Sequence, residues 1–174
     1  VHDGGPTSLR PGSLAGLVVL VQGGAGAVGH AAIQLARWAG ATVITTISGS
    51  EKATLASAAG AHHVVNYREQ DAAAEIRRVS PDGVDLIVEV APAQNAELDL
   101  AVIRNHGTIS VYADNGGDSV TLPIRNHFAL NVRYQFLLLY TVGIEAVATA
   151  AADINAAIED GALPIGEEAG LPLS

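Results

Sequence analysis

The segment from residue 17 to residue 40 constrains the fold most, because an apolar run, a glycine-rich turn and a helical pattern follow one another without interruption. Residues 17–21 are all apolar, as in a parallel strand that is covered on both faces. After the turn, apolar residues recur at helical spacing up to Gly40, and a glycine there is typical of a helix C-terminus. The pattern predicts a buried strand, a tight turn and a helix.

Three glycines in this turn, Gly24, Gly26 and Gly29, have the spacing G-x-G-x-x-G. In dinucleotide-binding proteins such glycines permit the tight turn, let the backbone approach the pyrophosphate and let the helix lie close to the strand. The helix N-terminus then offers free N–H groups and a positive dipole end to the anion. The turn predicts a pyrophosphate site formed by Gly23, Gly24, Ala25, Gly26, Ala27 and Val28. A turn with a purely structural role is the alternative.

Composition limits the class of protein. The chain has 174 residues, 49% of them hydrophobic and only 16% charged, which favours one folded domain with a substantial core. The net charge of −9 disfavours nucleic acid and anionic membranes as partners. The most lipid-like run, residues 136–144, is far shorter than the roughly 20 residues of a spanning helix. The absence of cysteine suits a cytoplasmic protein, which we predict here.

Strand and helix patterns alternate along the rest of the chain. We predict further strands at residues 42–47, 63–66, 84–90, 108–112 and 132–139. We predict further helices at 51–59, 71–79, 95–103, 124–130 and 144–158. The last helix has its apolar stripe at Ile144, Val147, Ala151, Ile154 and Ile158. This order implies an α/β Rossmann fold over residues 17–161, a doubly wound parallel sheet of six strands with helices on both faces.

The end of the second predicted strand indicates which dinucleotide binds. NAD-specific domains usually place an acidic residue there, and that carboxylate would repel the 2′-phosphate of NADP. Residues 46–50 read T-I-S-G-S, and the only lysine of the chain, Lys52, follows shortly afterwards. A positive charge beside hydroxyl groups suits a phosphate, so we predict that NADPH is preferred over NADH. The alternative is that Ser48 and Ser50 cap a helix and that Lys52 is merely solvated.

Three motifs together resemble a known family. They are the run 18–40, the segment Asn66-Tyr67-Arg68-Glu69 and the segment Gly83-Val84-Asp85. In this order they resemble the zinc-independent quinone oxidoreductases related to zeta-crystallin, which belong to the medium-chain dehydrogenase/reductase superfamily. Members of that family carry an N-terminal GroES-like catalytic domain, to which their C-terminal segment returns. By this resemblance, residues 1–16 are expected to be a linker remnant and residues 162–174 a truncated C-terminal segment.

The resemblance also implies which residues hold each end of the cofactor. Ser48, Lys52 and Tyr67 match positions around the 2′-phosphate and adenine. Main-chain groups after the fourth, fifth and sixth strands hold the nicotinamide ribose and carboxamide in relatives. They correspond here to Asn95, Val111, Tyr112, Ala113, Phe136, Leu137 and Leu138. Relatives often have glycines where this chain has Ala113 and the A-P-A segment at 91–93. For Phe136, the alternative is a strand residue that faces the core instead of the cofactor.

The function implied is hydride transfer from NADPH to a quinone or a related electrophilic carbonyl or enone, with this chain alone binding cofactor without catalysis. Two alternatives stay open: a non-catalytic NADP-binding sensor, and the cofactor domain of a zinc-dependent alcohol dehydrogenase. We predict no catalytic or metal-binding residue. Position 48, four before Lys52, is serine rather than the tyrosine of a Tyr-x-x-x-Lys dyad, and no G-x-S-x-G elbow occurs.

The histidines do not predict a metal site, and the last predicted strand suggests a dimer. Metal-ligand spacing is not found among His2, His30, His62, His63, His106 and His127, which we interpret as structural or surface residues. Residues 132–139 alternate in character, as an edge strand does. In the family that the chain resembles, this strand meets its symmetry mate across a two-fold axis, so we expect a homodimer through the sixth strand.

Overall fold

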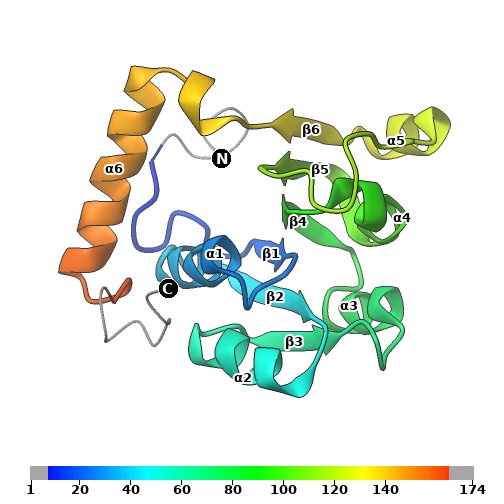
Figure 1. Cartoon of the computed structure of the whole chain (residues 1–174), viewed down its shortest axis with the longest axis horizontal. Helices are drawn as coiled ribbons and strands as arrows, with labels where there is room; N and C mark the ends of the chain where they lie inside the picture. Colours follow the sequence, from blue (N-terminus) through cyan, green and yellow to red (C-terminus); the bar gives the residue numbers. More distant parts are fainter. Residues whose placement is uncertain (1–7, 165–174) are drawn as a thin grey trace.

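One parallel sheet organises the computed structural model, which describes residues 8–164 (Figure 1). Its strands are β1 (Val18–Val21), β2 (Thr42–Ile47), β3 (His63–Asn66), β4 (Val84–Glu89), β5 (Ile103–Val111) and β6 (Arg133–Phe136). They lie in the order β3-β2-β1-β4-β5-β6, and every neighbouring pair is parallel. The strand order reverses between β1 and β4, which is the place where such sheets bind ligands. The predicted six-stranded Rossmann fold is confirmed.

Helices follow the strands, as predicted. They are α1 (Ala27–Trp38), α2 (Ser50–Ala58), α3 (Ala72–Val79), α4 (Pro92–Val102), α5 (Ile124–Leu130) and α6 (Ile144–Glu159), with a short 3-10 turn η1 (Leu139–Thr141) before the last. The first helix ends where expected: Gly40 has φ +90°, which suits glycine. The N–H groups of Gly40 and Ala41 donate to the carbonyls of Arg37 and Ala36, as in a Schellman motif.

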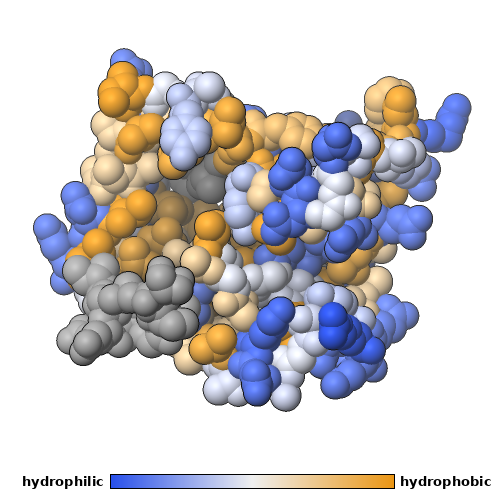
Figure 2. All heavy atoms as spheres, in the orientation of Figure 1, coloured by the Kyte–Doolittle hydropathy of each residue, from blue (hydrophilic) through white to orange (hydrophobic). Residues whose placement is uncertain are grey.

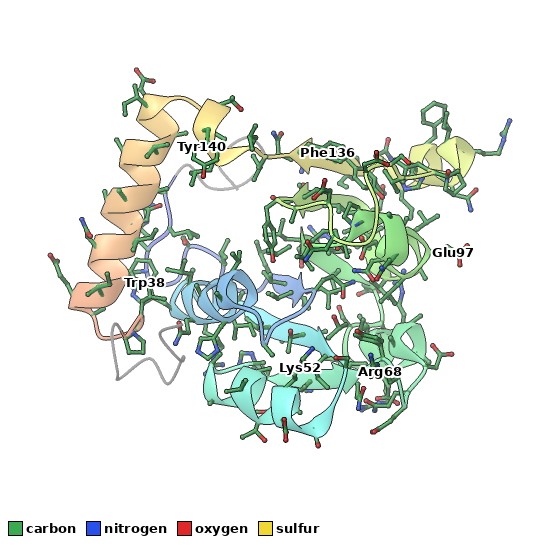
Figure 3. The ribbon with its side chains drawn as sticks, viewed as in Figure 1. Trp38, Lys52, Arg68, Glu97, Phe136 and Tyr140 are labelled. Carbon is green, nitrogen blue, oxygen red and sulfur yellow. The ribbon has the colours of Figure 1, made fainter. Side chains whose placement is uncertain are left out.

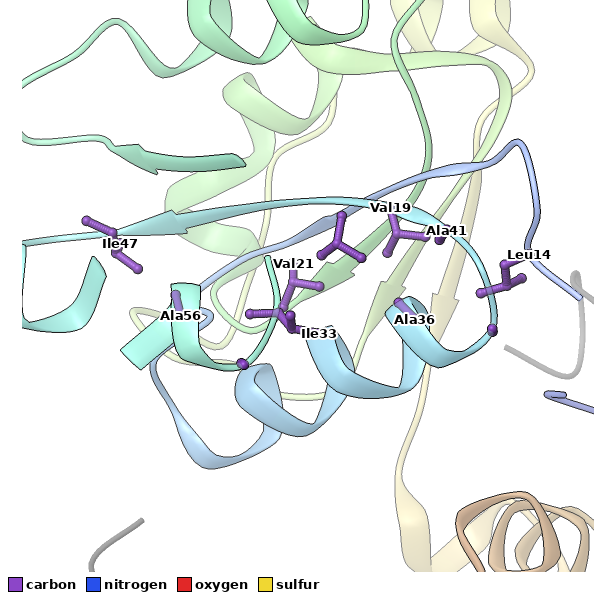
Figure 4. Close-up of a cluster of buried hydrophobic side chains, with 11 residues drawn as sticks. Leu14, Val19, Val21, Ile33, Ala36, Ala41, Ile47 and Ala56 are labelled. Carbon is purple, nitrogen blue, oxygen red and sulfur yellow. The ribbon is translucent and has the colours of Figure 1, made fainter. Parts of the chain in front are cut away.

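The continuous apolar runs are explained by a core on each face of the sheet. Successive strand residues point to opposite faces. Val21 therefore packs with Ile33 of α1 on one face (Figure 4), whereas Leu20 packs with Ile76 of α3 on the other. Burial of each such side chain stabilises the fold by roughly 1.5 to 3 kcal/mol. Helices α1 and α2 thus cover one face, and α3 and α4 cover the other.

Three predicted boundaries were wrong. Helix α4 begins at Pro92 rather than at residue 95, because proline is favourable in the first turn of a helix. Strand β5 begins at Ile103 rather than at residue 108, because Ile103 pairs with Val84 before the register shifts. Strand β6 ends at Phe136 rather than at residue 139, because the chain turns into η1, where the Thr141 N–H donates to the Leu138 carbonyl.

Hydrogen bonds connect α6 and its C-terminal end to the rest of the domain, whereas much of its predicted apolar stripe is exposed. The indole of Trp38 (labelled in Figure 3) donates to Asp160 at 2.9 Å. The Ser8 hydroxyl and the Leu9 N–H donate to Asp153, each at 2.7 Å. The predicted apolar stripe lies on α6, but three of its residues are exposed: Ile144 by 80%, Val147 by 37% and Ile154 by 38%. Within residues 8–164, no helix has the length and the apolar character needed to cross a bilayer.

The segment before β1 belongs to the packed structure. Leu14 lies within the stretch expected to be a linker, yet it is buried in the core, and its N–H donates to the Ala39 carbonyl. His2, the start of the expected linker and most of the expected C-terminal segment lie outside the described residues.

Candidate cofactor-binding site

The glycine turn between β1 and α1 is built so that two of its glycines admit no side chain. A Cβ at Gly24 would press into Thr45 Oγ1 and lie 2.7 Å from Ile33 Cδ1. A Cβ at Gly29 would press into the Gly23 carbonyl oxygen and lie 2.9 Å from the Gly24 Cα. At Gly26 the nearest atom would be 3.5 Å away, which is an ordinary contact. Gly24 and Gly29 therefore bring the helix close to the strand, and Gly26 leaves open space above the turn.

The open space faces the start of α1. The exposed N–H groups of Ala27 and Val28 have no hydrogen-bond acceptor within the described part of the chain. Gly26 is the N-cap, without a side-chain cap, and the first turn holds no acidic residue. Free N–H groups and the positive end of the helix dipole attract a phosphate, so the turn fits the predicted pyrophosphate site.

The second predicted group assembles where β2 and β3 end. The Lys52 ammonium donates to the Ser48 hydroxyl at 3.0 Å, and both side chains are accessible. The Tyr67 N–H donates to the Ile47 carbonyl at 3.1 Å, which holds the tyrosine beside the end of β2. Arg68, on the same side of the sheet as Lys52 (Figure 3), is a further exposed cation that we had not proposed as a site residue. Together these side chains form a polar, cationic surface suited to a phosphate.

The third predicted group lies at the carboxyl ends of β5 and β6. A cavity of about 460 Å³ is lined by Pro92, by the loop after β5 and by six of the predicted residues, Val111, Tyr112, Ala113, Phe136, Leu137 and Leu138. The Leu137 N–H donates to the Val111 carbonyl at 2.8 Å, which joins the two strand ends. Phe136 is 58% exposed, so its alternative interpretation as a core residue was wrong.

An apolar groove adjoins this cavity. It has a volume of about 700 Å³ and is lined by α6, by the segment from β6 to η1 and by Leu35 of α1. Figure 2 shows apolar side chains gathered along α6 and η1. Tyr112 and residues 136–138 line both spaces, so the cavity and the groove meet at the end of β6.

Asn95, the remaining predicted residue, points into a buried polar network. Its amide nitrogen donates to both carboxylate oxygens of Glu89, at 3.0 and 3.2 Å. Glu89 also accepts the Ala91 N–H. On the other side of the network, the Gln22 amide donates to Asp99 at 2.9 Å. Neither Glu89 nor Asp99 exposes any surface.

The sequence contained one signal for this network. Glu89 follows the apolar run 86–88 at the end of β4, and a charged residue in a strand covered on both faces is buried only when it has partners. Its partner Asp99 follows on α4, and only the fold shows that the two carboxyl groups meet.

Burial and the neighbouring Glu89 charge raise the pKa of Asp99 to about 9. Burial, with the Asp99 and Glu89 charges, likewise raises the pKa of Tyr134 to about 12. Burial, with the Glu89 charge, also raises the pKa of Tyr112. Asp99 therefore keeps its proton at neutral pH, and both tyrosines stay uncharged.

The described histidines include one neighbouring pair, His62 and His63, and the others lie in separate elements. Burial lowers the pKa of His30, which lies in the first turns of α1. His62 accepts the Val43 N–H at 2.9 Å, and burial, Arg37 and His63 lower its pKa. Within residues 8–164, no three histidine, aspartate or glutamate side chains gather in a way that could hold a metal ion.

Comparison with known proteins identifies the family. The family model for zinc-binding dehydrogenases matches residues 27–156, from the start of α1 into α6, and this range includes Lys52, Glu89 and Asp99. The chain belongs to the zinc-binding dehydrogenase family. Within it, the domain is similar to a 2-haloacrylate reductase of Burkholderia sp., with 37% identity over 66% of this chain and 34% of that protein. It is 30% identical to the quinone oxidoreductase of Sus scrofa, over 84% of this chain and 44% of that protein.

A solved structure supports the same placement. This dehydrogenase domain superposes on a mycobacterial protein complexed with NADPH, with a TM-score of 0.78 and 30% identity, over 87% of this chain and 48% of that one. The chain thus spans less than half the length of these relatives. The resemblance to quinone oxidoreductases of the medium-chain dehydrogenase/reductase superfamily, expected from the motifs, is confirmed.

Proposed function

We propose that this domain binds NADPH for a reductase that transfers hydride to a quinone or a related electrophilic carbonyl or enone. The observation that carries the proposal is the contact between Lys52 and Ser48 beside Tyr67, where an NAD-specific domain would hold a carboxylate. Its relatives include quinone oxidoreductases and a structure with bound NADPH. A chain without cysteine suits the reducing cytoplasm, where we propose that it works.

In this proposal, the cofactor lies across the carboxyl edge of the sheet. Lys52, Ser48 and Tyr67 bind the adenosine 2′-phosphate, and the N–H groups at the start of α1 bind the pyrophosphate. The cavity at the ends of β5 and β6 holds the nicotinamide, which supplies the hydride when the cofactor is bound. This chain's own contribution is position and electrostatics.

The proposal is tested by titrating the chain with each reduced cofactor in a calorimeter. We expect NADPH to bind at least about tenfold more tightly than NADH, because a charge-assisted contact contributes about 1.5 to 3 kcal/mol. Equal affinities would contradict the proposed preference.

The two alternative functions differ in what the rest of the protein does. A sensor module would bind NADPH without any associated turnover, and a zinc-dependent alcohol dehydrogenase would need metal ligands elsewhere in its chain. We favour the quinone reductase, because quinone oxidoreductases are among the relatives.

We expect this chain by itself to bind cofactor without reducing quinone, because the described residues provide nothing that closes over the nicotinamide cavity.

We also propose a homodimer through β6, whose outer side has no neighbouring strand in the described part of the protein. The Leu137 N–H points to β5. Because successive N–H groups of a strand point to opposite sides, the Phe136 N–H faces the open edge. Phe136→Pro should therefore remove an outward donor and convert a dimer to a monomer at micromolar concentration, as measured by sedimentation.

The control is Phe136→Ala, which keeps the backbone donor and should stay dimeric if main-chain pairing forms the contact. A monomeric unmodified chain would remove the basis for this interface.

A further inference from the structure

We propose that Asp99 and Glu89 share one proton and act as positioning residues for the cofactor, and that loss of this proton weakens NADPH binding. The inference rests on the proposed function and deepens it. The two carboxyl groups would fix the position of Asn95 relative to the glycine turn. Neither carboxyl group contacts the cofactor itself.

A series of hydrogen bonds supports this role. It starts at the turn, where the Gly23 N–H donates to the Thr46 hydroxyl at 3.3 Å. The Thr46 hydroxyl donates to the side-chain oxygen of Gln22, Oε1, and the side-chain nitrogen of Gln22 donates to Asp99 Oδ1. Asp99 neighbours Glu89, whose charge helps to raise the pKa of Asp99, and Glu89 accepts the Asn95 amide. The network thus joins β2, β1, α4 and β4, on both sides of the point where the strand order reverses.

The direction of these bonds requires a proton on Asp99. Asp99 Oδ2 is buried and receives no hydrogen bond from any N–H or O–H group of the described residues. Glu89 already accepts from the Ala91 N–H and the Asn95 amide. A proton on Asp99 turns this unpaired oxygen into a donor to Glu89, which completes the network.

Among the described residues, no cation contacts the pair. The neutral Gln22, directly after β1, donates to Asp99, and the uncharged Tyr112 after β5 and Tyr134 of β6 lie close enough for the pair to raise their pKa. Arg77 of α3 donates to the Ala101 and Ile103 carbonyls near the other end of α4. Ionisation of Asp99 would therefore place two carboxylates together in a site closed to water, which is strongly unfavourable.

The sign of the pH effect follows from the raised pKa of Asp99, about 9 against an ordinary value of 3.8. The native state holds a proton that the unfolded chain has released above its ordinary pKa. The contribution of this group to stability is complete below its ordinary pKa of 3.8 and is lost as the pH rises from there through about 9. In the folded chain, Asp99 loses the proton that it shares with Glu89 near the upper end of this pH range. That loss uncouples Asn95 from the glycine turn.

The experiment compares NADPH dissociation constants between about pH 7 and about pH 10, where the phosphates of NADPH remain ionised. We expect affinity of the unmodified chain to fall about tenfold across this range. Asp99→Asn should keep the affinity seen at pH 7 and lose the fall, because asparagine donates and accepts as protonated aspartate does. A circular dichroism spectrum at each pH confirms that the chain stays folded.

A second probe separates positioning from general loosening. Adenosine 2′,5′-bisphosphate carries the phosphate that Lys52 would bind but lacks the nicotinamide half, so its affinity should change far less with pH. A flat NADPH profile, the same fall in Asp99→Asn, or an equal fall for the bisphosphate would overturn the positioning role. Failure to bind NADPH even at pH 7 would instead contradict the proposed function.

Discussion

Gly29→Ala should destabilise the domain by about 3 kcal/mol, the upper range for overpacking a tight site. In most helices this exchange would stabilise by about 1 kcal/mol. Here the new Cβ would press into the Gly23 carbonyl oxygen and lie 2.9 Å from the Gly24 Cα. These are backbone atoms, which cannot rotate away as a flexible side chain can. Urea denaturation of the two proteins measures the difference in the free energy of unfolding.

Gly26→Ala is the matched control in the same turn. A Cβ there would meet its nearest atom at 3.5 Å, so stability should change little. The methyl group would occupy the space above the turn, however, and NADPH affinity should fall if the pyrophosphate lies there. Equal stability losses in both variants would contradict the packing interpretation, and unchanged NADPH affinity in Gly26→Ala would contradict the position of the pyrophosphate.

Lys52→Ala should weaken NADPH binding by about 10- to 100-fold and leave NADH binding nearly unchanged, as expected for the loss of one charge-assisted phosphate contact. The Lys52 ammonium lies 3.0 Å from the Ser48 hydroxyl, just after β2. Lys52→Ala therefore removes the cation and keeps the hydroxyl. Calorimetric titration with both cofactors measures the ratio of affinities.

Glu51→Gln serves as the control for Lys52, because it changes the exposed neighbouring charge on the same first turn of α2. It should not weaken NADPH selectively. If Lys52→Ala weakened both cofactors equally, the lysine would have no role in recognising the 2′-phosphate.

Much of the fold could be predicted because local patterns determine it. The apolar run of β1, the glycine turn and Gly40 each act on the residues directly beside them, and the alternation of strands and helices favours the parallel topology. The contact between Ser48 and Lys52 could also be predicted, since the two residues are four positions apart around the start of α2; that they bind a phosphate stays a prediction. Tyr67 required the resemblance to a family, because β3 brings it there from a distance.

Other features of the fold and of the candidate site could not be predicted, because they depend on contacts between distant parts of the chain. Strand β5 begins early because Ile103 pairs with Val84, and no local pattern around residues 104–107 indicates a strand. The stripe of α6 is apolar at helical spacing, but Asp153 faces the domain because Ser8 and Leu9 donate to it. The pairing of Asp99 with Glu89 likewise follows from how α4 lies on the sheet, which periodicity does not encode.

The hydrogen bonds from Ser8 and Leu9 to Asp153 join the start of the described chain to the middle of α6, the last helix. Leu9 and Asp153 also line the apolar groove, so the same contacts set one wall of that groove. A local opening of α6 would break both hydrogen bonds together and widen the groove, while the two cores on the faces of the sheet would stay packed.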